Sequence, residues 1–371
     1  MDELFVLKNA IQKGDLSETK TLILSKVSLS RSDISEAFLE AIKANKTEIF
    51  EYFIEEVDGL NLRYSDMKGR RALHYAVDVG NGKMVKELLK HGATICYNDN
   101  EGYQAVHIAS KNGDVDMLTF LINHGANISS AKTVKDGYTP IHIAAMSKQP
   151  QTLKVLIERS GSVNIQTRRN SNSLTPLHLA VKAGYEEIVE ILCEMNACLD
   201  LADIEGKVPL HYAADRGYFK IMKILRTHGA SLAIKDCNRR SILHYAVCSK
   251  SVDCVQFLID SGAEVNEPDL SDHTPLIAAV VVGSADIVGI LRKHGADVNV
   301  RGPGQETPLL FAASAGNFDV IKSLLDAGAD VLAVNRLKET VLHKCQKISR
   351  KIFRNCFISN ILQRCVIALL Q

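Results

Sequence analysis

Apolar residues recur at two fixed places in a repeat of about 33 residues. The first place is always alanine: Ala76, Ala109, Ala144, Ala180, Ala213, Ala246, Ala279 and Ala312. A leucine follows twelve residues later: Leu88, Leu121, Leu156, Leu192, Leu225, Leu258, Leu291 and Leu324. A glycine separates the two places in most repeats, so the pattern predicts a short first helix and then a second helix. A period of this length, kept at several positions, is typical of a stacked solenoid and not of one globular core.

A polar residue keeps the same period, two positions before the alanine. Histidine fills this place in most repeats: His74, His107, His142, His178, His211, His244 and His343. Ile277 and Leu310 fill it in the other two repeats. The imidazoles come one to a repeat and do not converge on a metal ion. We interpret each as a structural histidine that bonds the adjoining turn, because buried polar groups need hydrogen-bond partners.

Capping residues mark the ends of the predicted helices. A threonine-proline pair can begin the first helix, since the hydroxyl caps free N–H groups and proline lacks a donor that would be unpaired there. A glycine at the end of the second helix suits a left-handed closing residue. The segments 137–145 (GYTPIHIAA) and 291–299 (LRKHGADVN) carry these features and resemble ankyrin repeats. The resemblance implies an all-α ankyrin-repeat solenoid of paired antiparallel helices with hairpin fingers.

The repeats divide the chain into three parts. We expect eight ankyrin repeats over 66–336, preceded by two degenerate capping repeats over 1–65, which lack the threonine-proline and glycine-alanine pairs. A solenoid needs such caps to cover its apolar ends. Segment 337–371 is both basic and apolar, and we interpret it as a C-terminal capping unit or tail. Its charged residues are Lys338, Lys344, Lys347, Arg350, Lys351, Arg354 and Arg364, with Glu339 as the one acid.

Composition excludes several classes of function. The net charge is +1, so the whole chain has no strong long-range attraction to nucleic acid. No run of eighteen apolar residues predicts a membrane span, and the acidic N-terminus does not resemble a leader. The nine cysteines form no paired framework, and we expect most at helical, partly buried positions. These features predict a cytoplasmic protein, with the nucleus as the alternative. We find no nucleophile elbow, phosphate-binding loop or metal-ligand spacing, and predict neither enzyme activity nor a cofactor.

The resemblance implies that a partner binds at the finger tips and the concave face of the first helices. Tyr103, Tyr138 and Leu174 are predicted to form an exposed apolar stripe on neighbouring repeats, beside the two longer repeats. In the later repeats the corresponding positions of this face carry small, uncharged residues, such as Cys248 and Val281. The residues expected to contact the partner are Arg70, Tyr103, Lys111, Tyr138, Met146, Arg168, Arg169, Leu174, Lys182, Lys207, Arg216 and Arg240.

We therefore predict a non-enzymatic scaffold or adaptor that binds one partner protein through this surface. The basic residues among the candidates favour an acidic or phosphorylated segment of the partner. Two alternatives remain at this point. One is a substrate receptor of a ubiquitin ligase, recruited through 337–371. The other is a protein that binds a small ligand or nucleic acid on the concave basic patch, although the low net charge makes nucleic acid the weaker choice.

Overall fold

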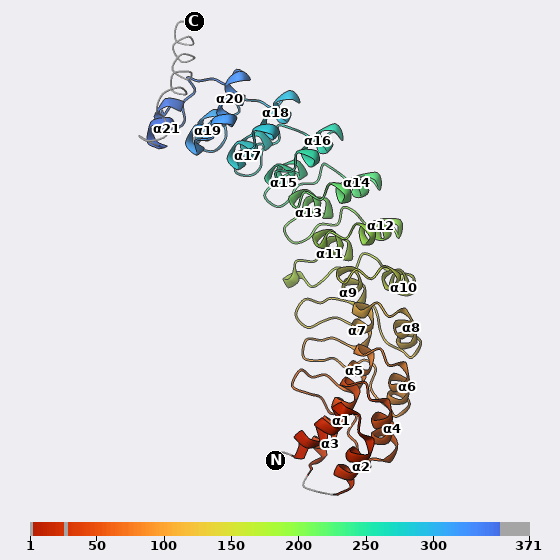
Figure 1. Cartoon of the computed structure of the whole chain (residues 1–371). Helices are drawn as coiled ribbons and strands as arrows, with labels where there is room; N and C mark the ends of the chain where they lie inside the picture. Colours follow the sequence, from red (N-terminus) through yellow and green to blue (C-terminus); the bar gives the residue numbers. More distant parts are fainter. Residues whose placement is uncertain (1–2, 26–28, 349–371) are drawn as a thin grey trace. The chain divides into compact units, whose positions relative to one another are not determined.

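The chain divides into two compact units, residues 1–197 and 198–371. The computed structural model describes residues 3–25 and 29–348. In both units the helices come in pairs, and Figure 1 shows two helical layers within each unit. The predicted all-α ankyrin-repeat solenoid is confirmed.

Unit 1 contains six helix pairs. Its first helices are α1 (Glu3–Lys13), α3 (Arg31–Lys43), α5 (Ala72–Asp78), α7 (Ala105–Asn112), α9 (Pro140–Met146) and α11 (Pro176–Ala183). Its second helices are α2 (Leu16–Leu24), α4 (Thr47–Glu56), α6 (Gly82–Lys90), α8 (Val115–Asn123), α10 (Pro150–Ser160) and α12 (Glu186–Glu194). A short 3-10 turn, η1 (Arg169–Ser171), lies in the longer loop before α11. From α1 to α11, consecutive first helices pack on one another, as α5 does on α7.

Unit 2 repeats this arrangement. Its first helices are α13 (Pro209–Asp215), α15 (Ile242–Cys248), α17 (Pro275–Val282), α19 (Pro308–Ala315) and α21 (Val341–Ile348). Its second helices are α14 (Phe219–Thr227), α16 (Val252–Asp260), α18 (Ala285–Lys293) and α20 (Phe318–Asp326). The turn η2 (Pro303–Gln305) lies in the finger before α19.

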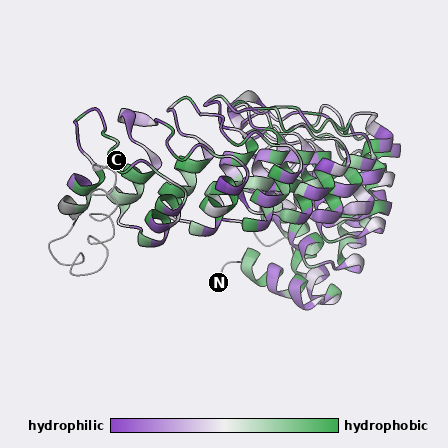
Figure 2. Cartoon of the chain, turned by 90° about the horizontal axis from the view of Figure 1, so that it is seen from above, coloured by the Kyte–Doolittle hydropathy of each residue, from purple (hydrophilic) through white to green (hydrophobic). Residues whose placement is uncertain are grey.

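The periodic apolar residues form the core. Every alanine and leucine of the two predicted rows is buried, which confirms the sequence pattern. The helices in Figure 2 alternate between apolar and polar segments, as expected where only one face is covered. Alanine matters in the first helix because its small side chain lets neighbouring first helices approach closely. Leucine on the second helix then fills the space between the two layers.

Capping fixes where the helices begin. Thr175, Thr274 and Thr307 each accept a hydrogen bond from the backbone N–H three residues later, as the threonine-proline pairs predict. Six of the described second helices have side-chain caps that we did not single out in the sequence. Asn81 and Asp114 are two of these, and each accepts a bond from the third N–H of its helix. Each such cap stabilises a helix by about 1 kcal/mol.

The fingers are joined to one another through their backbones. In unit 1 the N–H of Asn100 donates to the carbonyl of Lys68 at 3.0 Å, and that of Val134 to Glu101 at 2.8 Å. An aspartate shapes many fingers from within: Asp99 accepts the N–H groups of Glu101 and Tyr103 at 3.0 and 2.8 Å. Gly102 has a φ of +85°, and a Cβ there would meet the Val134 nitrogen at 2.4 Å. The fingers therefore form a continuous, hydrogen-bonded row within the unit.

Candidate functional site

Four of the repeated histidines, His74, His107, His142 and His244, join one finger to the next. The N–H of Gln104 donates to Nδ1 of His107 at 3.0 Å, inside one repeat. Nδ1 is therefore the acceptor, so Nε2 carries the proton and donates to the carbonyl of Tyr138, 3.2 Å away in the next finger. His74 and His142 make the same two bonds in unit 1, and His244 makes them in unit 2. The predicted structural role of the histidines is confirmed.

Burial sets the charge state of these histidines. It lowers the pKa of His107, His142 and His211 to about 4, because the apolar surroundings disfavour the charged imidazolium. The same cause lowers the pKa of His74 and His244. These five imidazoles are therefore neutral at physiological pH. Over residues 3–25 and 29–348, no three histidine, cysteine, aspartate or glutamate side chains gather in a way that would hold a metal ion.

Tyr103 and Tyr138 lie on consecutive fingers of unit 1. Both side chains are half-buried, and each ring lies near the histidine of its own repeat, with ring centroids 5.6 and 6.0 Å apart. Their backbone carbonyls accept the bonds from His74 and His107, so both residues are fixed in place. Burial raises the pKa of both phenols, and nearby carboxylates raise it further.

The phenolic hydroxyls of this pair differ from those of the tyrosines on the first helices α13 and α15. Within the part of the chain that the structure describes, neither the Tyr103 nor the Tyr138 hydroxyl has a hydrogen-bond partner. The Tyr212 hydroxyl, by contrast, donates to Asp203 at 2.5 Å, and that of Tyr245 donates to Asp236 at 2.7 Å. The Tyr103–Tyr138 pair thus presents two neutral hydroxyls that a second molecule can bond.

The prediction that Leu174 belongs to an exposed stripe is wrong. Its exposed fraction is only 5%. Thr167 holds its backbone from both sides: Thr167 Oγ1 accepts the Leu174 N–H at 2.8 Å, and the Leu174 carbonyl accepts the Thr167 N–H at 2.9 Å. His142 also donates to that carbonyl. These bonds fix the backbone of Leu174, and its apolar side chain is buried.

Several predicted basic residues are engaged inside the protein. Nε of Arg70 lies 3.4 Å from the buried carboxylate of Asp99, and Nε of Arg240 lies 3.5 Å from that of Asp269. Lys207 pairs with Glu205 at 2.7 Å. These pairs neutralise much of the predicted basic patch, which weakens the case for nucleic-acid binding.

The other predicted contact residues vary in exposure. Lys111 and Met146 are exposed on the first helices of unit 1, and Arg216 is exposed in unit 2. Lys182 is half-buried on α11. Arg168 is exposed and donates from Nη1 to the Val134 carbonyl at 2.7 Å, so it links two fingers. The neighbouring side chain, that of Arg169, lies outside the described part of the structure.

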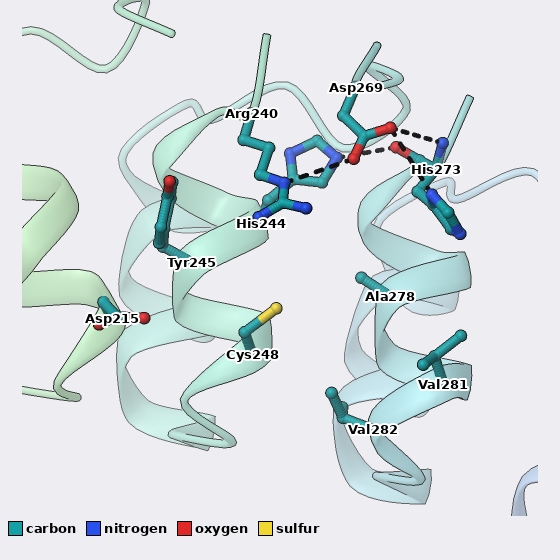
Figure 3. Close-up of a pocket in the computed structure, with 10 residues that line it drawn as sticks. All are labelled: Asp215, Arg240, His244, Tyr245, Cys248, Asp269, His273, Ala278, Val281 and Val282. Atoms are coloured by element: carbon teal, nitrogen blue, oxygen red, sulfur yellow. Dashed lines mark hydrogen bonds and ion pairs between the residues drawn. The ribbon is translucent and has the colours of Figure 1, made fainter. Parts of the chain in front are cut away.

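Unit 2 contains a pocket that the sequence reading treated as bland surface. It lies between α15 and α17 and has a volume of about 240 Å³. Figure 3 shows Cys248 on α15 and Val281 and Val282 on α17, with the Arg240–Asp269 pair and His273 at the finger end. The sequence does contain an indication of the pocket. Cys248 and Ala278 are small residues at positions where most repeats of unit 1 have large ones.

The cysteines depart from the prediction. Seven lie in the described part of the chain. Cys193, Cys254 and Cys345 are buried, but Cys248 is exposed on α15, and Cys96, Cys198 and Cys237 are exposed in loops. The expectation that most are helical and partly buried is therefore wrong for these loop residues.

Segment 337–371 lies largely outside the described residues. Its described start packs α21 on α19, and Lys344 contacts Glu306 and Glu339, the latter at 3.5 Å. Recruitment of a ubiquitin ligase through this segment stays a prediction. In the helices that the structure describes, length and apolar character both fall short of what a membrane span requires.

The fold and its ribbed surface define a repeat protein of the protein-interaction class. The chain belongs to the ankyrin-repeat proteins. The family model for ankyrin repeats in three copies matches residues 7–99, 91–168, 162–236, 193–269 and 229–302. The model for ankyrin repeats in many copies matches 309–351.

Known relatives share parts of this array. The mouse (Mus musculus) B-cell lymphoma 3 protein homolog is 40% identical over 73 residues, which cover 19% of this chain and 16% of that protein. A Danio rerio protein named as a palmitoyltransferase, ZDHHC13, is 28% identical over 200 residues, 53% of this chain and 30% of that protein. The chain thus matches less than a third of either relative. The crystal structure of the ankyrin repeat domain of Bcl-3, a member of the IkappaB protein family, superimposes with a TM-score of 0.53 at 27% identity, covering 62% of this chain and 99% of that domain.

Proposed function

We propose that the protein is a non-enzymatic adaptor that binds one partner protein through unit 1. The binding surface consists of the fingers and the first helices α5, α7, α9 and α11. The observation that carries this proposal is the Tyr103–Tyr138 pair. The two half-buried rings lie on consecutive fingers, their backbones are fixed by the histidine row, and their hydroxyls are unbonded among the described residues. Tyrosine concentrates binding energy because it offers a large apolar surface and a polar tip at low entropic cost.

The surroundings of the pair indicate the chemistry of the partner. The Lys111 ammonium is exposed and has no ionic partner among the described residues. Met146, on the next first helix, adds an exposed apolar side chain. An acidic or phosphorylated segment would pair with Lys111 and accept bonds from the neutral phenols. We expect binding in the cytoplasm or the nucleus. Little conformational entropy is lost, since the binding surface is preformed.

Replacement of Tyr103 and Tyr138 by alanine tests this proposal. Once a partner has been captured by affinity purification and identified by mass spectrometry, isothermal titration calorimetry gives its Kd. We expect each alanine variant to weaken binding by about 2 kcal/mol, which is typical of an interface hot spot. Phenylalanine variants remove only the hydroxyls and should lose a smaller part of the affinity, about 1 kcal/mol.

Tyr212→Phe provides the matched control. It removes a hydroxyl that is bonded to Asp203 inside unit 2, so it should lower the melting temperature and leave the Kd unchanged. A loss of less than about 1 kcal/mol in both alanine variants, with their stability intact, would remove the tyrosine pair from the binding surface.

A further inference from the structure

The pocket of unit 2 lies where two positions carry shorter side chains than in most repeats of unit 1. Ala278 stands one residue after the histidine place, where the other repeats carry Tyr75, Ile108, Ile143, Leu179, Tyr212, Tyr245 and Phe311. Cys248 stands three residues further along its own helix, at the place of Lys111, Met146 and Lys182. Short side chains at both places leave a hollow between α15 and α17 that longer ones would fill.

The size of the pocket selects the kind of occupant. Sites for whole small ligands have volumes of about 300–1,000 Å³. At about 240 Å³ this pocket is below that range and suits a single large side chain. Its walls include the exposed Val281, with 57% of its surface accessible, together with Val282, Ala278 and the Tyr245 ring. An apolar anchor residue is the occupant that such walls favour, since burying it removes apolar surface from water on both sides.

The charges at the rim add a second requirement. Arg240 pairs with Asp269 at 3.5 Å, so these two charges offset each other. Asp215 lines the opposite end of the pocket and is exposed. Its carboxylate forms no ion pair or hydrogen bond with any residue in 3–25 or 29–348. The rim therefore includes one carboxylate without an ion pair among the described residues, and Figure 3 shows Asp215 beside α15.

We propose that this pocket is a second docking site, which binds an extended segment of a partner protein. The segment inserts one leucine, methionine or phenylalanine side chain between Cys248 and Val281, and a neighbouring lysine or arginine pairs with Asp215. The site differs from the tyrosine surface of unit 1 both in location and in the charge it recognises. It can therefore be present whether or not the unit 1 surface binds its own partner.

A displayed library of random linear peptides tests the docking site. The library is selected on the full chain after depletion on Ala278→Tyr, a variant that restores the large residue of the neighbouring repeats and fills the hollow. We expect the enriched peptides to carry a large apolar residue beside lysine or arginine. A synthetic copy should bind Ala278→Tyr and Val281→Lys at least tenfold more weakly than the natural chain, and Asp215→Asn at least threefold more weakly.

Two matched variants control for general effects. Val252→Lys makes the same change at an exposed valine of α16, and Asp319→Asn does so at an exposed aspartate of α20; both should bind the peptide normally. Bound peptide should also slow iodoacetamide labelling of Cys248 at least threefold, while the exposed finger residue Cys237 keeps its rate. Circular dichroism checks that the pocket variants are folded. If only one of Ala278→Tyr and Val281→Lys folds, that variant suffices for the comparison of peptide affinity with the natural chain.

Three results would overturn the docking site. The first is a selection that yields no peptide sensitive to filling the pocket. The second is a set of enriched peptides that lack lysine and arginine, or that bind Asp215→Asn as tightly as they bind the natural chain. The third is a peptide that binds but leaves the labelling of Cys248 unaffected.

Discussion

Lowering the pH from 7 to 5 is expected to reduce the free energy of unfolding by about 5 kcal/mol, through three buried histidines. His107, His142 and His211 have a pKa of about 4 in the fold, against an ordinary value of 6.5. In an unfolded chain they bind protons as the pH falls below about 6.5, whereas the folded chain binds them only near 4. Each histidine therefore costs about 1.4 kcal/mol of stability per pH unit within this window, and the loss levels off below it.

The physical cause is the direction of the hydrogen bonds. Nδ1 of His107 accepts from the Gln104 N–H at 3.0 Å, so a proton on Nδ1 would set two donors against each other. Titration of the Asp66 and Asp269 carboxylates does not contribute to the change in stability between pH 7 and 5. The pKa of Asp66 and that of Asp269 are lowered in the fold by hydrogen bonds from backbone N–H groups and other polar neighbours, which outweigh the opposing effect of burial. Their contribution is present above their ordinary value of 3.8 and is lost only at lower pH.

Urea denaturation at pH 7, 6 and 5 measures this effect. The matched variant carries isoleucine at positions 107, 142 and 211, as the chain itself does at Ile277. Its stability at pH 7 is expected to be lower, because finger bonds are lost, but its dependence on pH between 7 and 5 should be much weaker. If the natural chain were equally stable at pH 7 and 5, the neutral histidine row would be the wrong account of the fold.

Truncation of Phe53 to alanine is expected to cost about 3–5 kcal/mol, the range for a fully buried aromatic side chain. Phe53 lies on α4, has no exposed surface, and packs on Phe38 with ring centroids 5.7 Å apart. Phe38 in turn stacks on Phe50 at 5.5 Å. Stability in a repeat array depends on contacts between neighbours, so this loss should open α1–α4 before the later repeats.

Hydrogen exchange followed by mass spectrometry, together with urea denaturation, measures both the size and the place of the change. Phe257→Ala is the control, because Phe257 is only half-buried and packs at the surface of α16 against Phe219, 5.7 Å away. It should cost about 1–2 kcal/mol. Equal losses in the two variants, or uniform exchange along the chain after Phe53→Ala, would contradict the view that this cluster closes the N-terminal end.

The sequence predicted what every repeat shares and failed where one repeat departs from the others. Alanine, leucine and histidine recur in the same environment, so the period alone identified their roles. Leu174 makes the same two backbone bonds as Tyr103 and Tyr138, yet its side chain is buried, and the period alone does not show that difference. The pocket at Ala278 is a similar case, because a missing side chain has meaning only once its neighbours Tyr245 and Val281 are placed in space.

The histidine row also bears on how such a protein can change in length. His74, His107, His142 and His244 each join their own repeat to the one that follows, as His107 does through the carbonyl of Tyr138. Duplication or deletion of a complete repeat therefore leaves most of these links intact and disturbs only the junction. Evolution can in this way extend or shorten the recognition surface in steps of about 33 residues. Single substitutions such as the one at Ala278 instead change the local shape of that surface.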